Sequence, residues 1–324
     1  MRFKIDKFVI AILIVIVVAY LFPSLGSKES TIPFDTIGSI GISLIFFFYG
    51  LKLSPDKIRS GLKNWKLHLL VQLTTFLFFP LLVIAFKPLI NTEDTQTLWL
   101  SFLFLAALPS TVSSSVVMVS IAKGNIPAAI FNASISGLIG IVVTPLWIGL
   151  FLTQTTTDYN IQSIYISLIT QILLPVILGI ILQRFWGKFA LKYSKQLTLF
   201  DKSIILLIIY KSFAESFAED LFGSVKATDL LLLFAIVIAL FYMVYFITGF
   251  ISKKLHFNSE DKITAQFCGT KKSLVHGTVF ADILFPSSMS IGFILLPLMV
   301  FHAAQIFIVS IIATRLAKRE NILE

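Results

Sequence analysis

Two polar clusters interrupt apolar stretches and hold the residues best suited to binding a solute or an ion. The first follows Pro109 and consists of the hydroxyl residues Ser110, Thr111, Ser113, Ser114 and Ser115. The second consists of Gly269, Thr270, Lys271, Lys272 and Ser273. Proline removes a backbone donor and weakens a helix, and serine or threonine can satisfy the freed groups. Each cluster therefore predicts a helix break that exposes backbone amides and carbonyls to a ligand, the alternative being ordinary kinks with small residues at helix contacts.

The paired lysines of the second cluster are costly in a membrane. An ionised lysine at the bilayer centre costs ~2.5–3.5 kcal/mol on insertion scales, and adjacent residues point to different sides of a helix. Lys271 and Lys272 reach the membrane surface if the span begins at Ser273. Otherwise they pair with an acid such as Glu215 or Asp229, or at least one faces a central cavity. There it would balance an anionic solute or replace a bound cation, which the flanking glycine and hydroxyl residues favour.

Further polar residues lie in apolar stretches and are candidates to line a cavity: Gln72, Asn132, Ser134, Ser136, Gln171, Glu215, His276, His302 and Gln305. A single amide or hydroxyl in a membrane helix more often bonds a neighbouring helix, at ~0.6 kcal/mol on average. Glu215 and His276 rank higher because ionisable groups inside spans are costly. His276 is a candidate proton carrier, with a neutral ring bonded to a backbone carbonyl as the equal alternative.

Composition indicates an integral membrane protein. Hydrophobic residues make up 57% of the chain and charged residues 13%, about half the ~25% typical of soluble domains. The mean hydropathy is +0.92. Basic residues before the first apolar run resemble a signal peptide, but a weak cleavage region and many later spans favour a retained helix. We expect the net charge of +9 to reflect membrane orientation, and we expect no nucleic-acid partner.

Hydropathy and charge together predict ten spans, with the seventh and ninth the least apolar. The predicted ranges are 8–22, 36–50, 67–86, 98–122, 126–152, 163–183, 203–218, 230–251, 265–281 and 290–314. Of the 26 lysines and arginines, 20 fall on one side, three on the other and three within spans. The positive-inside rule then places both termini in the cytoplasm, in an inner or plasma membrane.

The span layout repeats at half the chain length. Spans one, three and five begin near Phe8, Leu67 and Ile126, and spans six, eight and ten begin at similar offsets in the second half. Five is an odd number, so a second copy must be inverted relative to the first. We therefore expect a single transporter domain over 1–324, with repeats of about 1–155 and 156–324, as in many secondary transporters.

Several stretches resemble the bile acid:sodium symporter family, and within it the divergent orphan branch that includes the seventh human member. They are Val71–Pro80, Leu108–Pro145, Ile208–Phe217, Phe267–Gly277 and Leu295–Ile306. The resemblance implies an all-α fold of ten helices in two inverted five-helix repeats, with a panel, a core and a solute cavity between them. It also implies that the fourth and ninth helices are broken and cross.

The chain departs from the sodium-coupled members of that family. Those members carry Ser-Asn on the fourth helix, and a Glu followed by Gln-Asn on the ninth. Here Val116 follows Ser115, Phe267 replaces the Glu, and Lys271-Lys272 replace the Gln-Asn. We therefore hypothesise that a lysine ammonium occupies the space of a sodium ion.

The sequence thus predicts a secondary active transporter of a small organic, anionic solute, without a cofactor. Sodium remains the less favoured coupling ion, and a conventional sodium symporter or a non-transporting membrane sensor are the alternatives. We find no nucleotide loop, nucleophile elbow or paired metal-ligand motif, so an enzyme is not expected. The solute, the coupling ion and the oligomeric state stay open.

Overall fold

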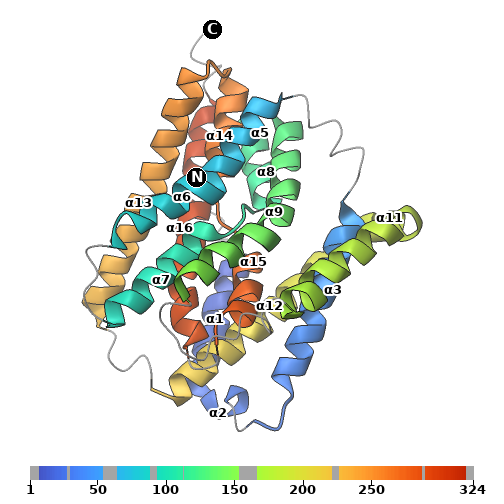
Figure 1. Ribbon diagram of the computed structural model, residues 1–324, viewed down its shortest axis with the longest axis vertical. Coiled ribbons are helices and arrows are strands. Elements are labelled where there is room, and N and C mark those ends of the chain that lie inside the picture. The colour runs from blue at the N-terminus through green and yellow to red at the C-terminus, as the bar shows by residue number, and fades with distance from the viewer. Residues whose placement is uncertain are drawn as a thin grey trace. The chain divides into compact units, whose positions relative to one another are not determined.

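The computed structural model describes residues 7–27, 30–53, 64–87, 93–111, 113–152, 166–220, 226–286 and 289–318, and its regular elements there are helices (Figure 1). The first half contains α1 (Lys7–Leu21), α2 (Pro23–Gly26), α3 (Phe34–Lys52), α5 (Trp65–Leu73), η2 (Thr74–Phe78), α6 (Phe79–Ile84), α7 (Glu93–Ala107), α8 (Ser113–Ile121) and α9 (Ile126–Leu152). The second half contains η4 (Ile169–Leu173), α11 (Leu174–Lys192), α12 (Ser194–Ala218), α13 (Ala227–Lys254), α14 (Ser259–Thr270), α15 (Leu274–Leu284) and α16 (Ile291–Ala317). Helices thus lie in all ten predicted span ranges.

Within the described residues, six helical stretches are long and apolar enough to cross a membrane, so the chain is a multi-pass membrane protein. They are Phe34–Lys52, Trp65–Ile84, Ile126–Leu152, Ile166–Lys192, Thr228–Lys254 and Ile291–Ala317. Lys7–Leu21 and Thr95–Ala107 are shorter apolar helices. The predicted fourth and ninth spans are each divided between two helices, α7 with α8 and α14 with α15.

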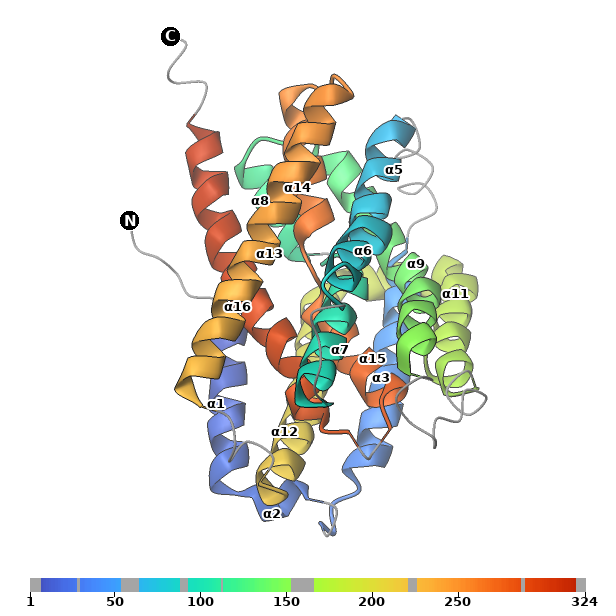
Figure 2. The same ribbon diagram turned by 60° about the vertical axis from the view of Figure 1, so that its left-hand side comes forward.

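The chain divides into two compact units, and each draws on both halves of the sequence. The first comprises Met1–Ser54, Gly149–Lys226 and Gly277–Leu295, and the second comprises Pro55–Ile148, Ala227–His276 and Leu296–Glu324. In the first unit α3 packs on α11, and α1 packs on α12. In the second unit α6 packs on α7. Helix α13 packs on α14, and these two helices lie side by side in Figure 2.

Two glycines allow a close contact between α3 and α11 in the first unit. A Cβ atom on Gly50 of α3 would lie 2.3 Å from the Val176 carbonyl oxygen and 3.0 Å from the Gly179 Cα. A Cβ on Gly179 of α11 would lie 2.3 Å from the Phe47 carbonyl oxygen. Backbone meets backbone here, which only residues without side chains permit, as in other close-packed membrane helices.

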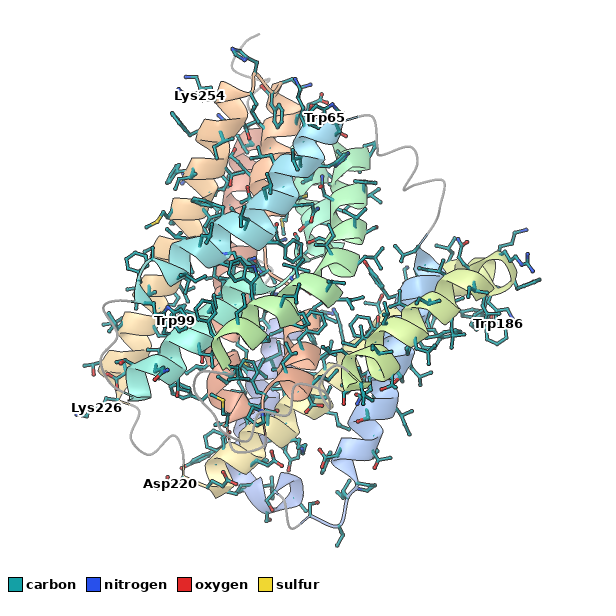
Figure 3. The ribbon with its side chains drawn as sticks, viewed as in Figure 1. Trp65, Trp99, Trp186, Asp220, Lys226 and Lys254 are labelled. Atoms are coloured by element: carbon teal, nitrogen blue, oxygen red, sulfur yellow. The ribbon has the colours of Figure 1, made fainter. Side chains whose placement is uncertain are left out.

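Aromatic rings and tryptophan donors hold the second unit together. The Phe301 ring of α16 lies 5.9 Å from Phe79 and 6.1 Å from Phe241. Trp99 of α7, labelled in Figure 3, donates from Nε1 to the Val83 carbonyl oxygen at 3.0 Å. Trp147 of α9 donates in the same way to the Phe76 carbonyl oxygen at 2.7 Å.

A buried carboxylate anchors the start of α14. The two oxygens of Asp261 accept hydrogen bonds from the Asn64 and Asn125 side-chain amides, at 2.7 and 2.8 Å. Its backbone nitrogen donates to the capping Asn258 oxygen at 2.7 Å. The Asn125 backbone nitrogen donates to the Thr264 hydroxyl at 2.9 Å. One acid thereby links the starts of α5, α9 and α14, which fixes the position of the helix that leads to the lysine pair.

Replacing Gly50 with alanine is expected to destabilise the protein by about 1–3 kcal/mol, since the new methyl group meets backbone atoms that cannot turn aside. The measurement is the melting temperature in detergent. Gly149→Ala is the matched control, because a Cβ there has no atom within 4 Å and alanine favours the helix. Equal melting temperatures for the two variants would contradict the close α3–α11 contact.

Candidate functional site

Both polar clusters coincide with interruptions between helices, and the residues of both interruptions belong to the second unit. Helix α7 ends at Ala107 and α8 begins at Ser113, while α14 ends at Thr270 and α15 begins at Leu274. Lys271 is extended, with φ −79° and ψ 143°. The Ser273 backbone nitrogen donates to the Pro109 carbonyl oxygen at 2.9 Å. The two interruptions, more than 160 residues apart in sequence, therefore touch through their backbones.

The Lys272 ammonium group lies at the centre of this contact. Its Nζ donates to the carbonyl oxygens of Thr75, Ala106 and Leu108 at 2.8, 2.6 and 2.9 Å. It also lies 4.4 Å from the centroid of the Phe79 ring, within range of a cation–π interaction. Lys272 is fully buried. Three acceptors match the three N–H donors of an ammonium group, so the buried polar head is fully satisfied.

The carbonyl of Thr75 is available because of a proline. In the π-helical segment η2 the Phe79 nitrogen donates to Thr74, one residue earlier than in an α-helix. The next nitrogen along belongs to Pro80, which has no hydrogen. The Thr75 oxygen therefore has no donor within its own helix, and Lys272 supplies one.

The other two oxygens belong to the end of α7, where four carbonyls lose their helical partners. The Ser110 nitrogen, which would continue the helix to Ala106, donates instead to the Ser136 hydroxyl at 2.9 Å. The Ala107 oxygen accepts from the Thr144 hydroxyl at 2.8 Å. Lys272 bonds the oxygens on either side of Ala107. A cation is favoured here because the carbonyl end of a helix carries partial negative charge.

Gln305 of α16 fixes the backbone of Lys272. Its Oε1 accepts from the Lys272 nitrogen and its Nε2 donates to the Lys272 oxygen, both at 2.8 Å. The side chain thereby replaces both backbone partners that the break removes. The sequence marked Gln305 as a polar span residue, but gave no sign of this two-way pairing.

The second lysine begins a chain of hydroxyl groups. Lys271 Nζ donates to Ser114 Oγ at 2.8 Å, and Ser114 donates to Thr111 Oγ1 at 2.9 Å. Thr111 and Ser115 hydroxyls are 2.8 Å apart. The Ser110 hydroxyl is buried and has no hydrogen-bond partner among the residues described. The structure thus brings four of the five predicted hydroxyl residues together around Lys271 and the interruptions; the side chain of Ser113 lies outside those described.

Among the other predicted residues of this unit, Gln72 and Asn132 contact each other from different helices, whereas Ser134 and Thr270 bond within their own helices. Gln72 donates to the Asn132 side chain at 3.2 Å, and its buried Oε1 has no hydrogen-bond partner in the described part of the chain. Ser134 and Thr270 instead bond carbonyls of their own helices, those of Ile130 and Gln266. Gly269 lies against Thr74.

His276 contacts a side chain of the same break. Its Nδ1 lies 2.9 Å from the Ser273 hydroxyl, which also accepts from the His276 backbone nitrogen at 3.3 Å. This nitrogen therefore has a hydroxyl as a partner. A hydroxyl can donate or accept, so this contact is compatible with either ring tautomer.

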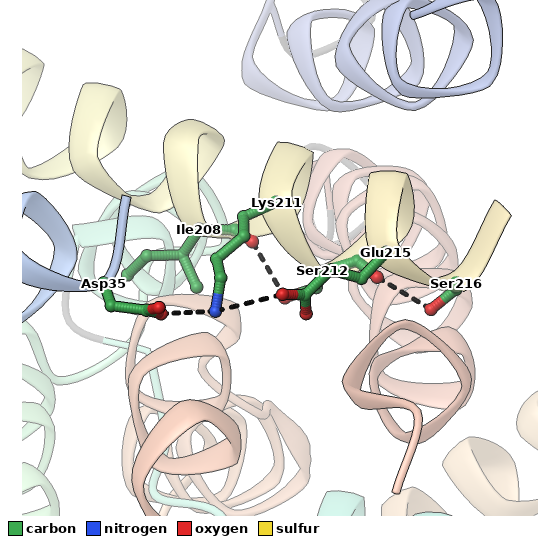
Figure 4. Close-up of polar contacts among 6 residues, drawn as sticks. All are labelled: Asp35, Ile208, Lys211, Ser212, Glu215 and Ser216. Atoms are coloured by element: carbon green, nitrogen blue, oxygen red, sulfur yellow. Dashed lines mark hydrogen bonds and ion pairs between the residues drawn. The ribbon is translucent and has the colours of Figure 1, made fainter. Parts of the chain in front are cut away.

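Glu215 belongs to the first unit and forms an ion pair with Lys211. It lies on α12, 3.4 Å from Lys211, which also forms an ion pair with Asp35 at the start of α3 (Figure 4). The sequence did not identify Asp35 as a partner. For Lys272, pairing with an acid such as Glu215 or Asp229 is one of the three possibilities that the sequence leaves open, and the partners of its ammonium group in the structure are three carbonyl oxygens.

These features define a polytopic helical membrane protein whose buried lysine bridges two interrupted helices. A model of the SBF-like CPA transporter family matches residues 6–318, and the chain belongs to that family. This confirms the resemblance to the bile acid:sodium symporters and makes the chain a member of a transporter family rather than an enzyme.

Relatives cover nearly the whole chain. An uncharacterised protein of Pseudomonas aeruginosa is 37% identical over 99% of this chain and 95% of its own length. The "Putative symporter YfeH" of Escherichia coli is 34% identical over 98% and 95%. The "Sodium/bile acid cotransporter 7-B" of Xenopus laevis is 32% identical over 96% and 91%.

Replacing Lys272 with methionine keeps an unbranched side chain, one atom shorter, and removes all three donors. Each buried carbonyl left without a partner costs ~1–3 kcal/mol, so we expect a marked fall in melting temperature in detergent. Lys254→Met, at an exposed position on α13, is the control and should change it little. Equal stability of the two variants would rule out a structural role for the Lys272 contacts.

Proposed function

We propose that the protein is a secondary active transporter of a small anionic organic solute, in which a lysine ammonium replaces a bound sodium ion. The observation that carries the proposal is the set of three carbonyl oxygens at 2.6–2.9 Å from Lys272 Nζ. Sodium is a hard cation that prefers oxygen ligands, and interrupted membrane helices supply such carbonyls to coupling ions in other transporters. In this chain the ammonium group of Lys272 takes the place of such an ion among the three carbonyl oxygens.

The sign of the solute follows from the charges near the breaks. Lys271 and Lys272 are both fully buried in the second unit, and Asp261 is the buried acid described there. Asp261 accepts hydrogen bonds from two asparagine amides. The excess positive charge favours a carboxylate, sulfate or phosphate group. Lys271, with the hydroxyls of Ser114, Thr111 and Ser115, offers donors suited to such an oxyanion.

We assign ten membrane spans in two inverted repeats, because the helix pairs exchange under that symmetry. Spans one, two, six and seven are α1, α3, α11 and α12. If span one is exchanged with span six and span two with span seven, the α3–α11 pair becomes the α12–α1 pair, and both pairs pack together in the first unit. In the second unit, exchanging three with eight and four with nine converts the α6–α7 pair into the α13–α14 pair. The two interruptions, in spans four and nine, correspond to one another and would cross at the contact between Pro109 and Ser273.

Transport by alternating access follows from this architecture. The protein would lie in the inner or plasma membrane with both termini in the cytoplasm, as the lysine and arginine distribution indicates. A conventional sodium-coupled organic anion symporter is the second candidate, because relatives bear the name sodium/bile acid cotransporter. Solute exchange or proton coupling, with His276 as proton carrier, are the modes open to the lysine-based transporter.

Purified protein in liposomes separates transport from sensing. Labelled taurocholate and small labelled carboxylates, sulfates and phosphates serve as probes, with potassium or sodium outside. Saturable uptake of an anion that is equal in the two salts supports the proposal. Uptake that requires a sodium gradient supports the conventional symporter, and binding of a probe without flux supports a sensor.

Sodium should leave the melting temperature of the wild-type protein unchanged when it replaces potassium at constant ionic strength. A cation that binds only the folded state stabilises the protein by ~2.7 kcal/mol when its concentration is a hundred times its Kd. Lys272→Asn and Lys271→Gln are measured alongside, and we expect Lys272→Asn to gain a sodium response, since it frees three carbonyl oxygens. A saturable sodium response of the wild-type protein would overturn the lysine-for-sodium proposal.

A further inference from the structure

Three cations form a row along the last turns of α11. Arg184, Lys188 and Lys192 are spaced four residues apart, so they lie on one face of the helix at steps of ~6 Å. Lys195 follows at the start of α12. The segment 166–200 contains no aspartate or glutamate, so the row is purely cationic.

These four cations form no ion pair with a carboxylate among the residues that the structure describes. Asp201, the first acid to follow them, is 3.6 Å from Lys52 of α3 and is thereby neutralised. Arg184 lies 4.5 Å from the Phe185 ring centroid and Lys192 lies 5.4 Å from that of Tyr193. Their hydrogen-bond donors are therefore available to an external anion.

A second row, of aromatic rings, runs beside the first. Phe185, Phe189 and Tyr193 follow the same four-residue spacing one position further along, and the rings of Phe189 and Tyr193 are 4.7 Å apart. Phe185 is 62% exposed and Phe189 is 54% exposed. Trp186, also 54% exposed, projects outward from α11 (Figure 3). Tryptophan and tyrosine side chains, here Trp186 and Tyr193, are typical of the membrane–water interface.

The length of the helix places both rows at that interface. The stretch Ile166–Lys192 has 27 residues and is therefore ~40 Å long, against a hydrocarbon thickness of ~30 Å. Its apolar part ends at Leu182, before Gln183 and Arg184. The surplus length carries the two rows into the headgroup layer.

We propose that this surface, formed by Arg184, Lys188, Lys192 and Lys195 with Phe185, Trp186, Phe189 and Tyr193, binds the phosphate groups of anionic phospholipids. Guanidinium and ammonium groups donate to phosphate oxygens, while the exposed rings contact the glycerol and upper acyl region. A soluble polyanion would use the cationic row and leave the aromatic row uncovered. The paired rows therefore favour a lipid.

The test compares two triple variants that remove the same charge. Arg184→Gln/Lys188→Gln/Lys192→Gln alters the proposed surface, and Lys253→Gln/Lys254→Gln/Lys262→Gln alters basic residues near the α13–α14 turn. Melting temperature in detergent is followed during titration with phosphatidylglycerol or phosphatidylcholine. At ~1 kcal/mol per basic residue, roughly a fivefold effect each, we expect the first variant to need on the order of a hundredfold more phosphatidylglycerol. The second should match the wild-type protein.

The phosphatidylcholine titration shows whether each variant is folded, and the wild-type protein gives an independent readout. Its response to phosphatidylglycerol should weaken as salt rises, because exposed charges are screened. Glycerol 3-phosphate at the same concentration should give no response. The proposal is overturned if the wild-type protein does not distinguish the two lipids, if both triple variants lose the response equally, or if glycerol 3-phosphate replaces the lipid.

Discussion

The contact between the Lys272 ammonium group and three carbonyl oxygens determines how the second unit is built. An interrupted helix in a membrane leaves backbone groups without partners, and each such group is costly where water is absent. Here the end of α7, the π-helical segment before Pro80 and the break after Thr270 would each leave such groups. The Lys272 side chain bonds three carbonyl oxygens, and the Gln305 side chain bonds the backbone nitrogen and oxygen of Lys272. The interruptions therefore stabilise one another.

This arrangement also explains why a lysine is tolerated at a position where it would otherwise be expensive. The cost of burying a charge falls when all its donors are bonded and when it faces the carbonyl end of a helix. The Phe79 ring adds a further favourable contact, 4.4 Å from the ammonium nitrogen. A sodium ion would draw on the same oxygens, which is why we relate the lysine to a coupling ion.

The two units distribute charge differently. In the second, buried lysines meet carbonyls and hydroxyls. In the first, Lys211 pairs with Asp35 and Glu215, and glycines allow α3 and α11 to touch along their backbones. The basic end of α11 points to a third use of charge, since its cations are paired with neither carbonyls nor acids in the described structure. Cations thus serve the helix breaks, the packing of α12 and, in our proposal, the lipid surface.

The sequence by itself determined the class of the protein, its helical ranges and the places where two helices break. Apolar length, loop charge and the residues around Pro109 and Lys271 are local properties, so they are readable without a fold. It also identified the family, because five stretches carry the resemblance. Only the tertiary structure decided the partners: that Lys272 bonds the oxygens of Thr75, Ala106 and Leu108, that Gln305 holds its backbone, and that Glu215 pairs with Lys211. Carbonyl oxygens occur at every residue and carry no sequence signal. Which of them are free depends on a proline and a helix end that folding brings together from distant parts of the chain.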